Sequence, residues 1–313
     1  MLAYIVRRLL ATIPVMGVVA LFVFSLLYLT PGDPAVIIAG DFATADDIAK
    51  IRARLGLDRP FWERFSEWAW MVVRGDLGIS IFTNLPVTTL INQRVEPTAA
   101  LTLTTLLVTV SLAVPMGVLA AWKAGRWLDR AVMAFAVLGF SVPIFVLAYL
   151  LIFTFSIHFD LLPVQGYTSI REGFWPWLQR LILPSVALGF TYIALIARIT
   201  RASMLDVLSQ DYICTAQAKG LAAGKVLVGH ALKNAAVPII TVIGIGIALL
   251  ISGVVVTETV FAIPGIGRLV VDAILRRDYP IIQGVILIFS GVYVLINLAV
   301  DISYTFLDPR IRY

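Results

Sequence analysis

The chain has 313 residues, of which 60% are hydrophobic and 14% charged, and its mean hydropathy is +0.95. Soluble globular domains are nearer half apolar and a quarter charged, so this composition excludes an ordinary soluble protein and indicates a lipid environment. One cysteine and two histidines exclude an internal disulfide and a conventional zinc or iron–sulfur site. The basic residues behind the net charge of +5 flank apolar runs, which is typical of membrane topology and argues against a nucleic-acid partner.

The first apolar run extends from about Ile5 to Leu29. A basic start followed by an apolar stretch is also typical of a secretory signal, but this run is too long and no small-residue cleavage site follows it. It ends instead at the turn Thr30-Pro31-Gly32-Asp33-Pro34. We therefore predict a first transmembrane helix over residues 1–29.

Residues 30–98 are predicted to form a small helical cap outside the cytoplasm. Thr44 and Asp47 have the spacing of a capping box, which predicts a helix that Gly56 ends. A second, amphipathic helix is expected over about 60–73, and its tryptophans are typical of the membrane–water boundary. The cap is either a structured cover on the outer leaflet or a gate or docking surface for a partner.

Five further apolar runs predict five more transmembrane helices. They are about Ala99–Ala121, Ala131–Ile157, Leu181–Leu205, Val237–Phe261 and Ile281–Phe306. With the amino terminus inside, the cytoplasmic side carries twelve basic residues and the short outer loops carry five, which predicts that both termini are cytoplasmic. The expected fold is therefore an all-α integral membrane protein with six transmembrane helices, a core over 99–306 and a cytoplasmic tail over 307–313.

The cytoplasmic segment 206–238, between the fourth and fifth runs, is predicted to form two short helices broken at Gly220-Leu221-Ala222-Ala223-Gly224. Small residues near the exposed turn of the first helix offer a flat surface onto which another protein can press. Because a membrane helix follows at each end, a push on this hairpin would move the spans.

At these residues the chain resembles the type I ABC importer permeases of the dipeptide/oligopeptide/nickel family. The resemblance rests first on the run from Thr215 to Leu221 and on His230-Ala231-Leu232-x-Asn234-Ala235, which is similar to the cytoplasmic coupling loop of that family. Further matches follow in the expected order along nearly the whole chain. They are Pro31-Gly32-Asp33-Pro34, Leu55 to Pro60, Gly75-Asp76-Leu77-Gly78, Leu183-Pro184, Arg198 to Leu208, Pro264-Gly265-Ile266-Gly267-Arg268, Arg277-Asp278-Tyr279-Pro280 and Asp308 to Arg312. Cys214 and Gln217 stand where the family commonly carries Arg, which weakens any charge-based contact at this loop.

The resemblance implies a transporter of two permeases, usually two different ones, and two cytoplasmic ATPases that bind ATP and Mg²⁺, fed by an extracytoplasmic solute-binding protein. It also implies alternating access, with the coupling loop docked on an ATPase. The residues expected in that contact are Asp211, Thr215, Ala216, Ala218, Lys219, Gly220, His230 and Asn234. Peptides are the first substrate class, and nickel chelates or glutathione-like peptides are alternatives within the family.

A channel or secondary transporter that works without an ATPase is the alternative from another class. Such a protein should show a coupling-ion site or a ring of pore residues, and neither is evident in the sequence.

The chain is not expected to be an enzyme or to hold a cofactor or metal. Gly220-x-x-x-Gly224-Lys225-Val226 superficially resembles a phosphate-binding loop, but it is one residue too short and has Val where a magnesium-binding Ser or Thr is needed.

Polar residues in the spans are candidates for function by default. Asp301, with Asn297 one turn earlier, is either a pathway residue or a partner for a basic residue such as Arg198 or Arg201. Glu258 and Arg268 near the outer side either form a gate or cap helix ends.

Overall fold

The structure, a computed structural model, describes residues 2–29, 34–39, 43–54 and 56–307. Within these ranges the regular structure is helical, and the only β-pairing is an isolated bridge between Ile79 and Pro86. Tertiary contacts divide the chain into two compact units. The first unit comprises residues up to 94 together with 269–294, and the second comprises 95–268 together with the residues from 295 onward.

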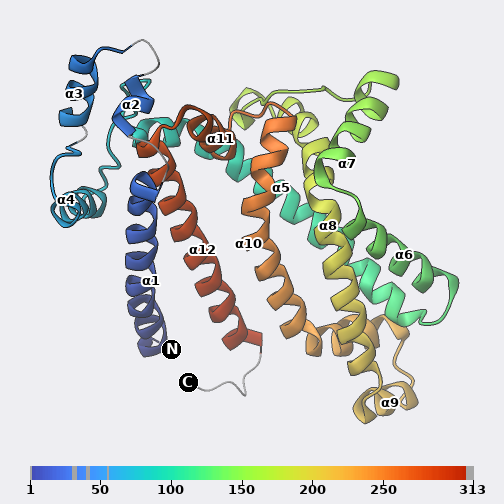
Figure 1. Ribbon diagram of the computed structural model, residues 1–313. Helices are drawn as coiled ribbons and strands as arrows, with labels where there is room; N and C mark the ends of the chain where they lie inside the picture. The colour runs from blue at the N-terminus through green and yellow to red at the C-terminus, as the bar shows by residue number, and fades with distance from the viewer. Residues whose placement is uncertain (1, 30–33, 40–42, 55, 308–313) are drawn as a thin grey trace. The chain divides into compact units, whose positions relative to one another are not determined.

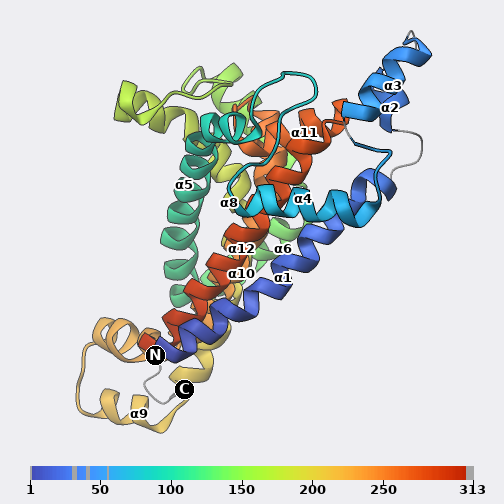
Figure 2. The same cartoon turned by 90° about the vertical axis from the view of Figure 1, so that its left-hand side faces the viewer.

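The first unit contains α1 (Leu2–Leu29), α2 (Pro34–Ala39), α3 (Ala45–Arg54), α4 (Phe61–Val73) and the start of α5 (Val87–Trp122). Most of α11 (Ile266–Arg276) and the first half of α12 (Tyr279–Leu307) also belong to it. α4 lies across the end of α1 (Figure 2), where the Phe24 ring contacts the rings of Phe61, Phe65 and Trp68 at centroid distances of 5.2–5.5 Å. Aromatic packing therefore ties the cap to the first span.

The second unit is built around α8 (Phe174–Leu208), which packs against three neighbouring helices, as Figure 1 shows. These neighbours are α6 (Trp127–Ser141), α7 (Ile144–Leu151) and α10 (Ala236–Val260). A π-helical turn, η1 (Ile152–His158), continues α7, and a single 3₁₀ turn, η2 (Ile170–Glu172), precedes α8. The segment between α8 and α10 contributes α9 (Asp211–Ala218) and the π-helical η3 (Lys225–Leu232).

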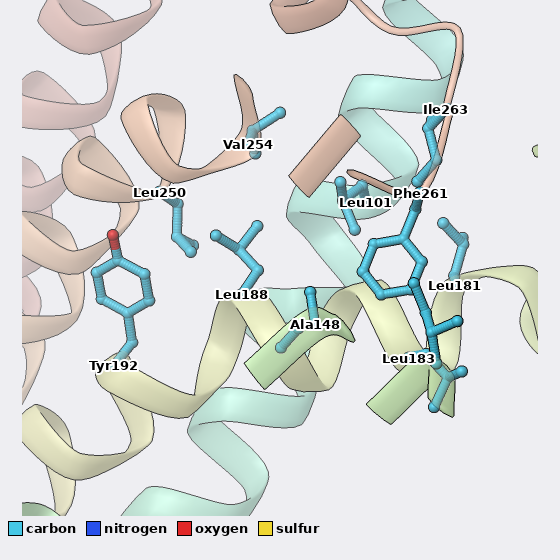
Figure 3. Close-up of a cluster of buried hydrophobic side chains, with 12 residues drawn as sticks. Leu101, Ala148, Leu181, Leu183, Leu188, Tyr192, Leu250, Val254, Phe261 and Ile263 are labelled. Carbon is cyan, nitrogen blue, oxygen red and sulfur yellow. The ribbon is translucent and has the colours of Figure 1, made fainter. Parts of the chain in front are cut away.

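The core of the second unit is a cluster of apolar side chains from α5, α7, α8 and α10, shown in Figure 3. Leu188 and Leu250 are almost completely buried in it. Small residues allow the helices to approach closely: a Cβ at Gly139 of α6 would lie 2.5 Å from the Cβ of Ala194, and one at Gly253 would lie 2.6 Å from Leu188 Cδ1. Because lipid gives no hydrophobic drive for helix association, such close packing is what holds membrane helices together.

Among the described residues, four helices are long and apolar enough to cross a membrane, and there are six spans if each of two bent helix pairs counts as one. One bent pair is the predicted third run, where α6 and the α7–η1 helix meet at 106°. Val142 there is extended (φ −94°, ψ 119°) because it precedes Pro143, and a residue before proline avoids the α conformation. The predicted third span, 131–157, is therefore broken into two helices, which make one span only if the bent pair crosses the membrane together.

The predicted cap helices are confirmed by α3 and α4. The Thr44 N–H donates a hydrogen bond to Asp47 Oδ2 at 3.2 Å, and the Asp47 N–H donates to Thr44 Oγ1 at 3.3 Å, as a capping box requires. Gly56 adopts a positive φ of 61°, which lets it end α3. α5 begins at Val87, inside the segment that was expected to be cap. The predicted motifs at residues 30–33 and 308–313, and with them most of the tail, lie outside the described residues.

Candidate functional site

The hairpin between α8 and α10 has the two short helices that the sequence predicts. α9 ends in a Schellman motif: the N–H of Gly220 donates to the Gln217 carbonyl at 2.9 Å, and the N–H of Leu221 donates to the Ala216 carbonyl at 3.3 Å. Gly220 has φ +76°, a conformation that other residues adopt only with strain. A sharp turn therefore follows α9, and a new helix starts after Ala222.

One side chain anchors α9. Ile213 is completely buried in a cluster with Met204 of α8 and with Val226, Leu227 and Ala231 of η3. Residues of α5 and α10 complete this cluster, and α9 itself packs against η3 and α8. Burial of a side chain of this size contributes about 1.5–3 kcal/mol.

The other faces of α9 and its turn are open. Asp211, Thr215, Ala218, Lys219 and Gly220 are exposed. Ala216 is half-buried and packs beside the cluster, while the Thr215 hydroxyl bonds back to the Asp211 carbonyl at 2.9 Å. All the predicted contact residues on α9 and its turn except Ala216 are therefore exposed.

The two remaining predicted contact residues lie on the second helix of the hairpin. Asn234 is exposed, and its side-chain amide donates to the His230 carbonyl at 2.7 Å. His230 is half-buried in the last turn of η3. These residues cap the end of that helix, where the chain bends by 73° into α10.

Glu258, at the end of α10, is completely buried. Its Oε1 accepts a hydrogen bond from the Thr98 hydroxyl at 2.5 Å, and its Oε2 accepts one from the backbone N–H of Arg268 at 2.9 Å. Thr98 in turn accepts the N–H of Ile266 at 2.8 Å. Two of the free N–H groups that begin α11 are therefore satisfied, and the carboxylate lies at the positive end of the helix.

The glycines of the predicted Pro264-Gly265-Ile266-Gly267-Arg268 motif make room for this carboxylate. A Cβ at Gly267 would lie 2.7 Å from the Cα of Val255 and 2.9 Å from Glu258 Oε2, and one at Gly265 would overlap the carboxylate. The structure thus brings Glu258 to the backbone of Arg268 in the arrangement of a helix cap. A role of either residue in gating stays a prediction.

Asp301 and Asn297 lie one turn apart on α12, and both are half-buried. Beside them Val300 packs on Gly244 of α10, where even a Cβ would have no room. Arg201, one of the basic residues considered as a partner of Asp301, forms its ion pair with Asp129 instead.

The Asp129–Arg201 pair was not predicted, because Asp129 precedes the start assigned to the third run. Asp129 is 4% exposed; its carboxylate bonds Arg201 through both oxygens, with Nη2···Oδ2 at 2.8 Å, and accepts the Gly125 N–H at 2.9 Å. An acidic residue at the edge of one apolar run and an arginine in a neighbouring run were the features of the sequence that could have indicated this ion pair.

A second missed contact lies in the first unit. Asp278 is 2% exposed and accepts hydrogen bonds from the Ser80 hydroxyl at 2.5 Å and the Ile81 N–H at 3.3 Å. It lies in the run Arg277-Asp278-Tyr279-Pro280 that carries part of the family resemblance. The sequence therefore pointed to Asp278 but did not identify Ser80 as its partner.

Comparisons with known proteins assign the whole chain. Residues 113–313 match the family described as the binding-protein-dependent transport system inner membrane component, and residues 1–113 match its N-terminal family. A probable peptide ABC transporter permease protein of Sinorhizobium fredii is 57% identical over 99% of both chains. A putative peptide transport system permease protein of Brucella abortus and the glutathione transport system permease protein GsiC of Escherichia coli are each 44% identical over 100% of both chains.

Among solved structures, an inward-facing MetNI methionine ABC transporter gives a TM-score of 0.59 at 18% identity. The match covers 70% of this chain and 96% of that one, so the two share a fold. The class defined by the fold and the matches is therefore the type I ABC importer permease.

The chain belongs to the family of binding-protein-dependent transport system inner membrane components. It is a multi-pass protein of the bacterial inner membrane, in a family that works with ATPase and solute-binding partners. The family recognised from the sequence is confirmed.

Proposed function

We propose that the chain is one of two permease subunits in an ATP-driven importer of dipeptides and oligopeptides, and that residues 206–238 contact the ATPases. The observation that carries the proposal is α9, which exposes one surface and inserts Ile213 into a cluster shared with α5, α8 and α10. The names of the 57% and 44% identical relatives support peptides as the substrate class. Glutathione is the second candidate because a 44% identical relative is a glutathione permease.

In this proposal the two bent helix pairs each count as one span, which gives six, and both termini are cytoplasmic. Residues 1–29 form the first span, 30–98 the outer cap, 99–306 the core and 307–313 a tail. The second permease is a different but related chain. ATP and Mg²⁺ are bound by the partner ATPases, and this chain has no catalytic or cofactor site of its own.

Transport follows from a differential contact. A permease alone cannot move a solute uphill, so the free energy must come from partners that hold α9 differently with and without ATP. ATP binding draws the paired hairpins together and opens the cavity to the solute-binding protein, and hydrolysis returns it to the inward-facing state.

The side of the membrane on which α9 lies can be tested with the native protein, because Cys214 is the only cysteine and is exposed. A membrane-impermeant maleimide should label Cys214 in inside-out vesicles and not in intact spheroplasts. A matched Cys214→Ser/Gln165→Cys variant places the thiol in the exposed loop before η2 and should give the opposite pattern. Labelling of Cys214 only from outside would overturn the topology and the coupling proposal together.

Coupling is tested by adding bulk to the exposed surface of α9. Ala218→Arg should leave the protein in the membrane but abolish uptake of a labelled dipeptide and co-purification of the ATPases. Ala124→Arg, at an exposed position of the α5–α6 turn, is the matched control and should leave both unchanged. Normal uptake by Ala218→Arg would refute the contact. If glutathione but not dipeptides competed for uptake, glutathione would replace dipeptides as the proposed substrate.

A further inference from the structure

The first unit contains a cavity of about 380 Å³ between α1, the α3–α4 segment and the start of α12. Its volume falls within the range of small-molecule sites in proteins. The proposed transport function makes no use of it.

Two buried polar side chains line this cavity. Tyr279 is 7% exposed, and its hydroxyl has no hydrogen-bond partner in the described part of the chain. Gln283, one turn later, is also 7% exposed, and its amide makes only a long contact of 3.5 Å with the Val23 carbonyl. A buried hydroxyl without a partner is costly, so a ligand that reached Tyr279 and Gln283 from the cavity would stabilise both groups.

Arg64 brings a positive charge to the same cavity. Its guanidinium lies over the rings of Phe24 and Tyr28, at 5.7 Å and 5.2 Å from their centroids, and donates a hydrogen bond to the Tyr28 hydroxyl. Arg59, which also lines the cavity, is bound by both carboxylate oxygens of Glu67 at 2.6 Å and 2.7 Å. Among the described ion pairs none involves Arg64, so its charge is available to an anion.

Most of the remaining lining is apolar and belongs to α1 and α4. Trp68 and Met71 of α4 and Leu27 of α1 line the cavity, and Met71 is 41% exposed. α1 is a candidate span of which only 11% is buried. An anion with an apolar tail therefore fits the cavity better than a free anion does.

We propose that this cavity binds a phospholipid of the outer leaflet, with its phosphate held by Arg64, its polar head near Tyr279 and Gln283, and its acyl chain along α1 and α4. Arginine suits this role because its planar guanidinium matches phosphate oxygens with two parallel hydrogen bonds. The lipid would link the cap to the first span.

The test measures phosphatidylglycerol binding to the purified, delipidated importer complex by native mass spectrometry. Arg64→Gln should weaken binding at least tenfold, and Tyr279→Phe, which removes one oxygen, should weaken it several-fold. Arg74→Gln is the matched control, since Arg74 lies at the end of the same helix and stacks over Trp70 at 4.6 Å but does not line the cavity. Its binding should equal that of the native protein.

Several results would overturn the proposal. They are no saturable binding to the native complex, equal binding by the Tyr279→Phe and native proteins, or displacement of the lipid by millimolar inorganic phosphate. Displacement by a dipeptide that depends on Arg64 would make the cavity a peptide site instead. If Arg64→Gln fails to assemble, the Tyr279→Phe comparison alone decides.

Discussion

Breaking the ion pair between Asp129 and Arg201 should destabilise the second unit near the hairpin between α8 and α10. The pair joins the first turn of α6 to α8. Arg201 lies three residues before Met204, which belongs to the cluster that anchors α9. Asp129→Asn keeps the shape of the side chain and removes its negative charge, and Arg201→Gln removes the positive charge of the partner.

The expected size follows from burial. Removing one partner of a buried ion pair costs about 3–5 kcal/mol because the other charge is left without compensation. The Arg201 side chain keeps 25% of its exposure, so water recovers part of the loss in Asp129→Asn, and we expect ~2–3 kcal/mol. The Asp129 side chain is only 6% exposed, so Arg201→Gln should cost more, ~3–4 kcal/mol.

The assay is reversible unfolding in detergent, followed by tryptophan fluorescence, for the native protein, both single variants and the double variant. The double variant should lose at least ~1 kcal/mol less than the sum of the two single losses, because they remove the same interaction. Asp206→Asn, at an exposed carboxylate of α8, is the control and should be neutral. Additive losses, or single losses no larger than that of the control, would refute the reasoning.

Two further predictions concern other carboxylates. Glu258→Gln leaves one acceptor oxygen for two donors, the Thr98 hydroxyl and the Arg268 N–H, so it should cost ~1–3 kcal/mol in the same unfolding assay. The exposed control Glu172→Gln should cost nothing measurable, and a neutral Glu258→Gln would contradict the cap. The hydrogen bond from the Thr44 hydroxyl, with that from its N–H, lowers the pKa of Asp47, so the stability it gives α3 is present above its unfolded pKa and is lost as the pH falls through the depressed value. Hydrogen exchange of the α3 amides, corrected for intrinsic rates, should therefore rise in acid, and the same rise in Asp47→Asn would show that the cap is not its cause.

Most of the fold could be predicted because the length of an apolar run and a local helix cap both depend on residues that are adjacent in the sequence. The long runs correspond to α1, α5, α8, α10 and α12, and the Thr44–Asp47 box gives the start of α3. The start of α5 was placed too late, at residue 99 rather than Val87, because residues 87–98 are polar. Hydropathy measures lipid compatibility, and a helix can begin in water before it enters the membrane.

The break at Pro143 shows a second limit. Pro115 and Pro184 lie inside continuous helices, yet Pro143 ends one. The sequence contains the same residue in each case, and the outcome depends on whether neighbouring helices satisfy the freed carbonyls, which is a property of the packing. α11 was missed for another reason, since an eleven-residue amphipathic segment is too short to be found by a search for spans.

The candidate site was predictable only where it is local. The α9 surface could be anticipated because its residues are contiguous. The Thr98–Glu258 and Asp129–Arg201 contacts join residues 160 and 72 positions apart, and no periodicity in one sequence connects positions at that distance. Their residue types marked them as unusual, and only the fold supplied their partners.

The burial of Ile213 separates two demands on α9. Ile213, with Ala216 beside it, packs into the cluster that holds α9, whereas Asp211, Cys214 and Ala218 are exposed. If α9 contacts an ATPase as proposed, substitutions on its outer face should alter that contact without disturbing how the permease folds. Exchange of these exposed residues between related permeases would then redirect a transporter to a different ATPase.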